Sequence, residues 1–227
     1  MRKVELVTTL EGSHSLFIAD LDEQYHSKYG AIQESQHVFI NAGLKYQAEQ
    51  FNEINILEVG FGTGLNALLT LQYAIENQLK INYYTIEPFP LAEEITTQLN
   101  YPNYLEEFKT AKNYFQELHT VSWNENHSIH QNFNFTKYQT TLQAIQLAQQ
   151  FHLCYYDAFA PSAQPELWTT AIFQKIYDNL LPNAVLVTYC AKGQVKRNFK
   201  SIGFQLEALS GPKGKREMVR AKKNEKK

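Results

Sequence analysis

The chain has 227 residues, 44% of them hydrophobic and 13% aromatic, and its 21 basic side chains nearly balance its 23 acidic ones. This apolar content excludes intrinsic disorder of the whole chain, and the length fits one large domain with a small extension. Two cysteines, Cys154 and Cys190, exclude a disulfide framework. Because no apolar run approaches the ~18 residues that cross a bilayer, we expect a cytoplasmic protein with no membrane association.

The first 50 residues predict a cover over the main domain. Residues 2–9 and 13–19 have the composition of two strands joined by a hairpin turn. Residues 20–50 are mixed and polar, with a helical part and an apolar patch at 38–40 that we expect to be buried. The predicted organisation is an N-terminal hairpin and helical cover at 1–50, a main domain at 51–221 and a basic tail at 222–227.

Strands and helices alternate from residue 54 onwards. This order predicts an α/β fold, Rossmann-like, with a mostly parallel sheet and helices on both faces. In such a sheet, ligands bind beyond the carboxyl ends of the strands. The expected strands are 54–59, 81–86, 133–138, 152–156 and 184–189, and the expected helices are 65–78, 91–99, 104–118, 142–150, 168–180 and 194–202.

The first strand of the main domain runs into a glycine-rich loop, Glu58-Val59-Gly60-Phe61-Gly62-Thr63-Gly64. Glycines let the backbone turn sharply and let a ligand lie directly against it. A dinucleotide fingerprint would need a third glycine where Leu65 stands, and the Gly-Lys-Ser/Thr of a phosphate-binding loop is absent. Glu58 would repel a pyrophosphate, whereas it can pair with the cationic end of S-adenosylmethionine. The alternative is a tight turn with no ligand.

Acids end two further strands. Glu87 follows the strand at 81–86, where its carboxylate can accept hydrogen bonds from both ribose hydroxyls of a nucleoside. Asp157 follows the strand at 152–156 and precedes Phe159 and Pro161. A carboxylate there can accept the N–H bonds of an amine, orient its lone pair and help to remove its proton. The alternatives are an ordinary surface acid at Glu87 and an aspartate that satisfies turn amides at Asp157.

The net charge of −2 conceals an asymmetry. Residues 186–227 contain twelve basic and three acidic side chains, whereas residues 1–185 contain nine basic and twenty acidic ones. A concentrated basic end favours a polyanionic partner such as RNA. For residues 222–227 alone, a solubilising tail is an equal alternative. The basic residues between 192 and 216 lie within folded sequence and therefore carry more weight.

These motifs resemble the tRNA 5-methylaminomethyl-2-thiouridine methyltransferases, which exist as the stand-alone MnmD and as the methyltransferase half of bifunctional MnmC. The resemblance covers nearly the whole chain, and its most specific stretches are 157–161 with 165–168, and 215–218. It implies a class I S-adenosylmethionine-dependent methyltransferase domain at 51–221. The implied reaction is N-methylation of the aminomethyl group of wobble 5-aminomethyl-2-thiouridine, and the implied partner is the anticodon stem-loop of tRNA.

The resemblance also implies roles for individual residues. Asp157 is the expected catalytic residue. The expected cofactor-binding residues are Tyr25, Ser27, Glu58, Gly60, Phe61, Gly62, Gly64, Asn66, Glu87, Gln139 and Asp157, and the expected substrate-binding residues are Glu34, Phe159, Pro161, Lys192, Lys196, Arg197, Lys215 and Arg216. The oxidoreductase half of the bifunctional relative has no counterpart here, so we expect no FAD and a substrate already aminomethylated by other enzymes.

Two features depart from simple expectations. Tyr138-Gln139 stands where the family usually has Gly-Asp, and the Gln139 amide can still hydrogen-bond the adenine amino group. His127 and His130 have a spacing that could hold a metal ion, but the polar loop around them offers no third ligand, so we expect no metal.

Two rival interpretations come from other classes. A small-molecule amine methyltransferase or polyamine aminopropyltransferase would share the glycine loop and the acidic amine site, but it would not need the basic end. A second acid usually follows closely after the catalytic one in aminopropyltransferases, whereas Ala158-Phe159-Ala160 follows Asp157. A catalytically inert RNA-binding module is the other rival, and it would not bind the cofactor.

Overall fold

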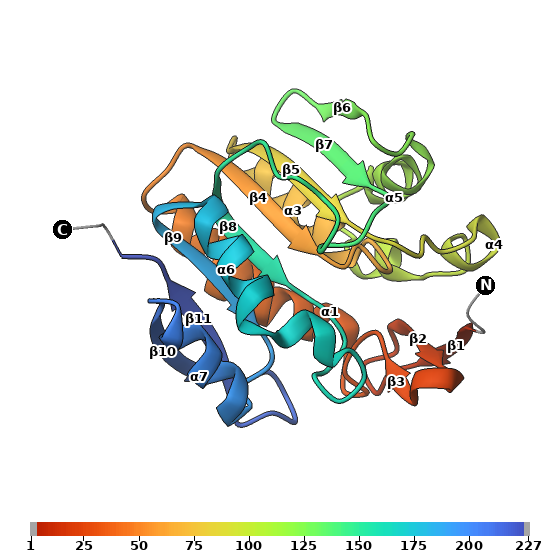
Figure 1. Cartoon of the computed structure of the whole chain (residues 1–227). Coiled ribbons are helices and arrows are strands. Elements are labelled where there is room, and N and C mark those ends of the chain that lie inside the picture. Colours follow the sequence, from red (N-terminus) through yellow and green to blue (C-terminus); the bar gives the residue numbers. More distant parts are fainter. Residues whose placement is uncertain (1–3, 225–227) are drawn as a thin grey trace.

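The computed structural model describes residues 4–224, and a single twisted sheet forms its centre (Figure 1). The strands of this sheet are β4 (Glu53–Val59), β5 (Lys80–Ile86), β6 (Asn126–His130), β7 (Phe133–Tyr138), β8 (Phe151–Tyr156), β9 (Leu180–Thr188), β10 (Gln205–Ser210) and β11 (Glu217–Lys222). They lie in the order β10-β11-β9-β8-β4-β5-β7-β6. The strands from β9 to β7 are parallel, whereas β6, β10 and β11 are antiparallel additions at the two edges.

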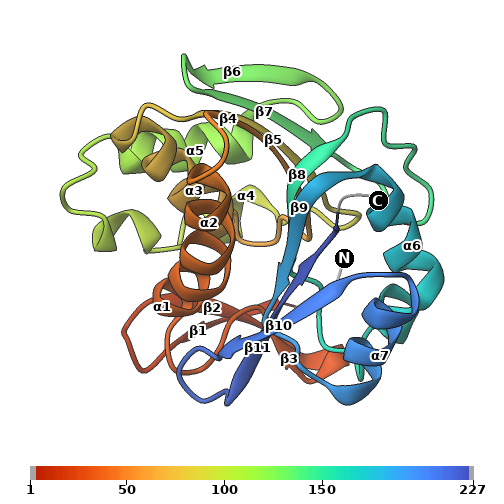
Figure 2. The same cartoon turned by 90° about the vertical axis from the view of Figure 1, so that its left-hand side faces the viewer.

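Helices cover both faces of this sheet (Figure 2). One face packs against α1 (Ala31–Ser35), the π-helix η2 (Gln36–Lys45), α2 (Tyr46–Ala48), α3 (Leu65–Glu76) and α5 (Ala111–Thr120), and the other packs against α6 (Thr170–Asn179) and α7 (Gly193–Ser201). Short turns of helix occur at η1 (Ala19–Leu21), η3 (Tyr101–Tyr104), α4 (Glu93–Thr96) and η4 (Pro165–Trp168). The predicted fold class is therefore confirmed.

The pattern of β4 explains why the sheet needs two helical layers. Ile54 and Ile56 belong to the hydrophobic core under α3, whereas Leu57 and Val59 belong to the core under α6 and α7. Successive side chains of a strand point to opposite faces, so a strand with apolar residues in both sets must be covered on both sides. This arrangement leaves the carboxyl ends of β4, β5 and β8 open at one edge.

A separate three-stranded antiparallel sheet belongs to the N-terminal cover. It consists of β1 (Val4–Thr8), β2 (His14–Ile18) and β3 (Glu23–Gln24), and β1 pairs with β2 as the predicted hairpin. The backbone N–H of His14 donates to Asn100 Oδ1 at 2.7 Å, which holds the hairpin against the loop before α5. The patch at 38–40 is buried as predicted, in η2.

Several predicted elements differ from the structure. The segment 142–150 is one short turn at 142–144 followed by irregular chain. Only Leu142 and Ile145 are buried there, and the Thr141 side chain accepts a hydrogen bond from the backbone N–H of Ala144. The helix expected at 91–99 shrinks to α4, and the one expected at 104–118 begins instead at the start of α5.

Three strands of the central sheet, and the short β3 of the cover, have no counterpart in the predicted set. β6, β10 and β11 are edge or near-edge strands whose polar residues weaken the alternating pattern. β11 extends through Lys222, and Lys223 Nζ donates to the backbone oxygens of Tyr177 and Leu180. β11 thus includes Lys222, the first residue of the predicted tail, and residues 225–227 of that tail lie outside the described residues. No helix within residues 4–224 is long and apolar enough to cross a membrane.

Candidate functional site

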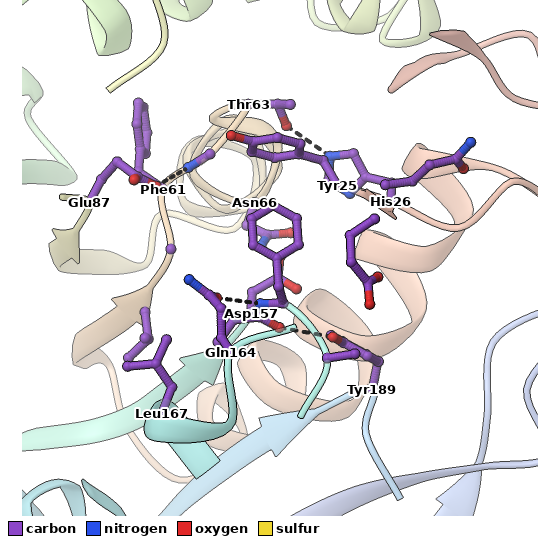
Figure 3. Close-up of a pocket in the computed structure, with 18 of the residues that line it drawn as sticks. Tyr25, His26, Phe61, Thr63, Asn66, Glu87, Asp157, Gln164, Leu167 and Tyr189 are labelled. Atoms are coloured by element: carbon purple, nitrogen blue, oxygen red, sulfur yellow. Dashed lines mark hydrogen bonds between the residues drawn. The ribbon is translucent and has the colours of Figure 1, made fainter. Parts of the chain in front are cut away.

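A cavity of about 610 Å³ opens at the carboxyl ends of β4, β5 and β8. Figure 3 shows Tyr25 and His26 on the side of the N-terminal cover, with Gln164 and Leu167 across the cavity. The glycine loop and the segment after β8 form its floor. This is the edge at which the sequence places a ligand in a parallel α/β sheet.

The glycine loop brings bare backbone to the cavity wall. Gly60 and Gly62 line the cavity and have positive φ angles of 94° and 50°. Gly64, with a φ of 75°, is not part of the lining, in contrast to its expected contact with the cofactor, and a Cβ there would lie 2.8 Å from His119 Nε2. A Cβ at Gly60 would lie 2.8 Å from the backbone oxygen of Asp157, and one at Gly62 would lie 3.0 Å from the Tyr25 ring. Only glycine combines this backbone conformation with these close approaches. The predicted role of the loop as a close contact for a ligand therefore fits its geometry.

Glu87 locks the loop to the end of β5. Its carboxylate accepts hydrogen bonds from the backbone N–H of Gly62 at 3.1 Å and from that of Phe89 at 2.8 Å. The side chain is 9% exposed and lines the cavity. A carboxylate has about four lone-pair sites and can therefore accept several hydrogen bonds at once.

Asp157 lies on the cavity floor, beneath the aromatic residues that close over it. Asn66 Nδ2, from the first turn of α3, donates to Asp157 Oδ2 at 2.9 Å. Burial, together with the negative charge of Glu34, raises the pKa of Asp157 to about 7, although the bond from Asn66 and the charge of Lys215 oppose the shift. A carboxyl with this pKa can take up and release a proton near neutral pH.

Glu34 and Lys215 form an ion pair at the cavity mouth, with 2.8 Å between Glu34 Oε1 and Lys215 Nζ. The other Glu34 oxygen accepts the backbone N–H of Ser27 at 2.7 Å. Lys215 Nζ also lies 3.7 Å from the centroid of the Tyr189 ring, and the Tyr189 hydroxyl donates to the backbone oxygen of Ala158. The pair therefore joins the N-terminal cover to the segment around the acidic site.

Aromatic residues from the cover complete the cavity. The Tyr25 and Phe159 rings meet edge to face, with centroids 5.0 Å apart. His26 Nε2 lies 2.8 Å from Thr63 Oγ1 in the glycine loop, and burial lowers the pKa of His26 to about 4. His26 is thus neutral at physiological pH and acts as a hydrogen-bonding link between the cover and the loop (Figure 3).

Glu58 does not reach the cavity, in contrast to its expected contact with the cofactor. Its side chain is 0% exposed and is absent from the cavity lining. Neither carboxyl oxygen has a hydrogen bond of good geometry within residues 4–224, although Thr85 and Tyr83 lie beside it. Burial raises the pKa of Glu58 to about 8, so the carboxyl is largely neutral at pH 7. A neutral group has little attraction for a cationic amine.

Gln139 also lies away from the cavity. Its side chain is exposed, and its backbone N–H donates to Asn124 Oδ1 at 3.2 Å. The chain turns before it reaches the cavity, where Thr141, Leu142 and Gln143 form the wall instead.

The remaining predicted residues fall into two groups. Tyr25, Ser27, Glu34, Phe61, Asn66, Phe159 and Lys215 line the main cavity, whereas Pro161, Lys192 and Arg216 line a neighbouring hollow. Lys196 pairs with Glu217 at 2.5 Å, and Arg197 bonds to the Gln194 side chain. Sequence reasoning missed His26, Gln164 and Tyr189, although the position of Tyr189 at the end of the strand expected at 184–189 was an available signal.

Carboxylates dominate the charge around the main cavity. Its lining includes the acids Glu23, Glu34, Glu87, Asp157 and Glu166, against the cations Lys28 and Lys215. An acidic cavity floored by bare glycine backbone suits a ligand that carries both a nucleoside and positive charge. Within residues 4–224, no group of three or more His, Cys, Asp or Glu side chains is arranged to hold a metal ion.

Known proteins resemble the chain in both sequence and fold. The bifunctional MnmC protein of Methylobacillus flagellatus, a tRNA 5-methylaminomethyl-2-thiouridine biosynthesis protein, is 26% identical over 214 residues, which cover 89% of this chain and 33% of that protein. Its counterpart in Leptospira interrogans is 29% identical, with coverage of 87% and 32%. The chain thus spans about a third of the length of these relatives.

Solved structures support the fold. The crystal structure of MnmC2 from Aquifex aeolicus matches 97% of this chain and 70% of its own, with a TM-score of 0.81 and 23% identity. Spermidine synthase from Thermotoga maritima matches with a TM-score of 0.58 and 12% identity, covering 99% of this chain and 70% of its own. A family model described as S-adenosyl-L-methionine-dependent methyltransferase matches residues 103–224. Because that match covers more than half of the chain, the protein belongs to the S-adenosyl-L-methionine-dependent methyltransferase family.

Proposed function

We propose that this protein methylates the aminomethyl group of wobble 5-aminomethyl-2-thiouridine in tRNA. The similarity to the MnmC proteins, along most of this chain, supports this substrate. The observation that carries the chemistry is Asp157, an acid with a pKa near neutrality at the floor of an acidic cavity. Such a site suits an amine that must lose a proton while it gains a methyl group.

The cavity lining suggests which residues hold the cofactor. S-adenosylmethionine supplies an electrophilic methyl group when it is bound. The backbone of the glycine loop is placed to contact its methionine part, and Glu87 to accept hydrogen bonds from its ribose hydroxyls. Leu142 and Gln143 line the cavity whereas Gln139 does not, which supports these two residues as the contacts for the adenine.

The protein side of the reaction centres on the amine. Asp157 accepts hydrogen bonds from the amine nitrogen and so directs its lone pair, while Asn66 fixes the orientation of the carboxylate. The neutral amine would form its N–C bond as the bond between the methyl group and the sulfonium sulfur breaks, which would leave the neutral thioether S-adenosylhomocysteine. The methylated nitrogen then releases one proton, and Asp157 Oδ takes it up. Tyr25 and Phe159 shield this position from solvent and offer aromatic surfaces to the uracil ring.

The proposal can be tested with purified protein, S-adenosylmethionine and tRNA that carries the unmethylated aminomethyl uridine. We expect nucleoside mass spectrometry to show conversion of this nucleoside to the 5-methylaminomethyl form. Unchanged wobble nucleosides, under conditions in which the protein binds S-adenosylmethionine, would contradict the proposed substrate.

The reaction products distinguish the proposed function from the rival functions that act on a small amine. An acidic cavity would also accept a polyamine, so the same preparation should be incubated with putrescine and with either S-adenosylmethionine or its decarboxylated form. Methylated or aminopropylated putrescine, formed while tRNA is left unchanged, would favour an amine methyltransferase or an aminopropyltransferase. We expect neither product.

A further inference from the structure

A second hollow, of about 510 Å³, lies beside the main cavity. The two share three lining residues, Ala160, Tyr189 and Lys215, so they are neighbouring parts of one surface. The segment after β8 runs from one to the other, with Asp157 in the main cavity and Pro161 in the hollow. A substrate chain bound at Asp157 therefore has a direct path past Tyr189 into the hollow.

The two spaces differ in charge. Acids outnumber cations around the main cavity, whereas the hollow is lined by Lys192, Lys215 and Arg216 against a single acid, Glu217. Glu217 is already paired with Lys196, and Lys215 is paired with Glu34. A phosphodiester would be repelled by the main cavity and attracted by the hollow.

Lys192 and Arg216 are the cations with unused capacity. Within residues 4–224, neither forms an ion pair or a side-chain hydrogen bond, and both side chains are exposed. Lys196 and Arg197, by contrast, already bond to neighbours on the same surface. A new partner for Lys196 would have to compete with Glu217, so phosphate contacts are favoured at Lys192 and Arg216.

We propose that this hollow is a phosphate subsite, which binds through Lys192 and Arg216 a phosphodiester that flanks the methylated nucleotide. This inference rests on the proposed function, because it requires an RNA substrate whose base enters the main cavity. The wall formed by Tyr189 and Lys215 would separate the base from its backbone. It divides the substrate between two spaces of opposite charge.

The test uses an anticodon stem-loop RNA with wobble 5-aminomethyluridine, in its natural form and with one flanking linkage replaced by a neutral methylphosphonate. The two linkages beside the wobble nucleotide are replaced in turn. Three proteins are compared, namely wild type, the double variant Lys192→Ala/Arg216→Ala and the control Lys200→Ala. Lys200 is an exposed cation in α7, the helix that begins directly after Lys192, and it lies outside the hollow.

We expect the wild type and the control to show a KM for RNA that rises about tenfold with one of the neutral linkages, equivalent to one charge-assisted contact. The double variant should show a raised KM for natural RNA and no further rise with that linkage. Its logarithmic salt slope should be lower by about 0.7 for each phosphate that it no longer neutralises. The KM for S-adenosylmethionine should not change.

Two outcomes would separate the failure of this inference from that of the proposed function. Equal sensitivity to both neutral linkages in all three proteins, with natural RNA still methylated, would overturn the subsite alone. Absence of methylation of natural RNA by the wild type would overturn the proposed function and the subsite with it.

Discussion

At the scale of single residues, Asp157 determines how the reaction should depend on pH. Its pKa is raised to about 7, and only its ionised form can accept the amine proton. We therefore expect kcat/KM to fall as the pH drops below about 7. Asp157→Ala should lower turnover by a factor of about 10²–10⁴ and should remove the fall of kcat/KM at low pH. The affinity for S-adenosylmethionine should stay nearly unchanged.

Steady-state kinetics, measured between about pH 5.5 and 9 at intervals of about half a pH unit, would check this expectation. Asp157→Asn serves as the conservative comparison, because its amide oxygen can still accept an N–H bond but cannot take the proton. A loss of turnover below about threefold in the alanine variant is no larger than the effect of one weak contact. Such a small loss would show that solvent receives the proton.

Glu58 provides a second prediction at this scale, because burial raises its pKa to about 8. In the unfolded chain the pKa is near 4.5. Between these values the folded state keeps a proton that the unfolded state has lost, so Glu58 makes stability fall as pH rises from about 4.5 to about 8. Glu58→Gln should remove this fall in the free energy of unfolding, which for one group is at most about 1.4 kcal/mol per pH unit.

Urea denaturation at pH 5 and pH 8 would measure the effect. Glu53→Gln is the matched control, since Glu53 is exposed at the start of the same strand. Calorimetry on Glu58→Gln should show nearly unchanged binding of S-adenosylmethionine, because Glu58 lies off the cavity wall. A large loss of cofactor affinity would restore the role that the sequence suggested.

At the scale of elements, the glycine loop links β4 to α3 and forms part of the cavity floor. Gly62 has a φ of 50°, and a Cβ there would press on the Tyr25 ring. Gly62→Val should therefore abolish detectable binding of S-adenosylmethionine while most of the fold remains, since the strain lies at an open edge of the sheet.

Gly203→Val is the matched control for this loop variant. Gly203 also has a positive φ, of 102°, but it follows α7 and contacts Tyr177 away from the cavity. Both variants should lose stability, yet only Gly62→Val should lose the cofactor in calorimetry. Equal cofactor binding by the two variants would mean that the glycines of the loop only allow the backbone to turn and do not contact the cofactor.

At the scale of the whole molecule, contacts between distant segments close the site. The Glu34–Lys215 pair joins α1 to the loop between β10 and β11, and His37 Nε2 reaches the backbone oxygen of Ser210 at 2.7 Å. The pair also influences Asp157, because Glu34 raises the pKa of Asp157 and Lys215 lowers it. A substitution in this ion pair at the cavity mouth should therefore change the pKa of Asp157 at the cavity floor.

Opposite substitutions in this pair should move the pH profile in opposite directions. Glu34→Gln should shift the lower limb of kcat/KM to a lower pH, and Lys215→Met should shift it to a higher pH. Lys215→Met should also speed amide hydrogen exchange in residues 25–37 without affecting β4 or β8. Shifts in the same direction for both variants would mean that loosening of the cover, and not charge, governs the profile.

Local signals in the sequence were sufficient for the fold class, the glycine loop and the positions of Glu87 and Asp157. The alternation of strands and helices is a short-range pattern, and acids that follow parallel strands must gather at one edge of the sheet. These features depend on neighbours in the chain, so the sequence by itself determined them.

Only the tertiary structure decided which side chains meet in the cavity. Glu34 and Lys215 are 181 residues apart, and no local pattern indicates that they pair. Glu58 is the penultimate residue of β4, whereas Glu87 and Asp157 follow their strands, and neighbouring strands and α3 enclose it. Gln143 lines the cavity and Gln139 does not, although both follow β7 within a few residues. Burial, pairing and exposure result from long-range packing, and long-range packing sets the charge and the pKa of each group.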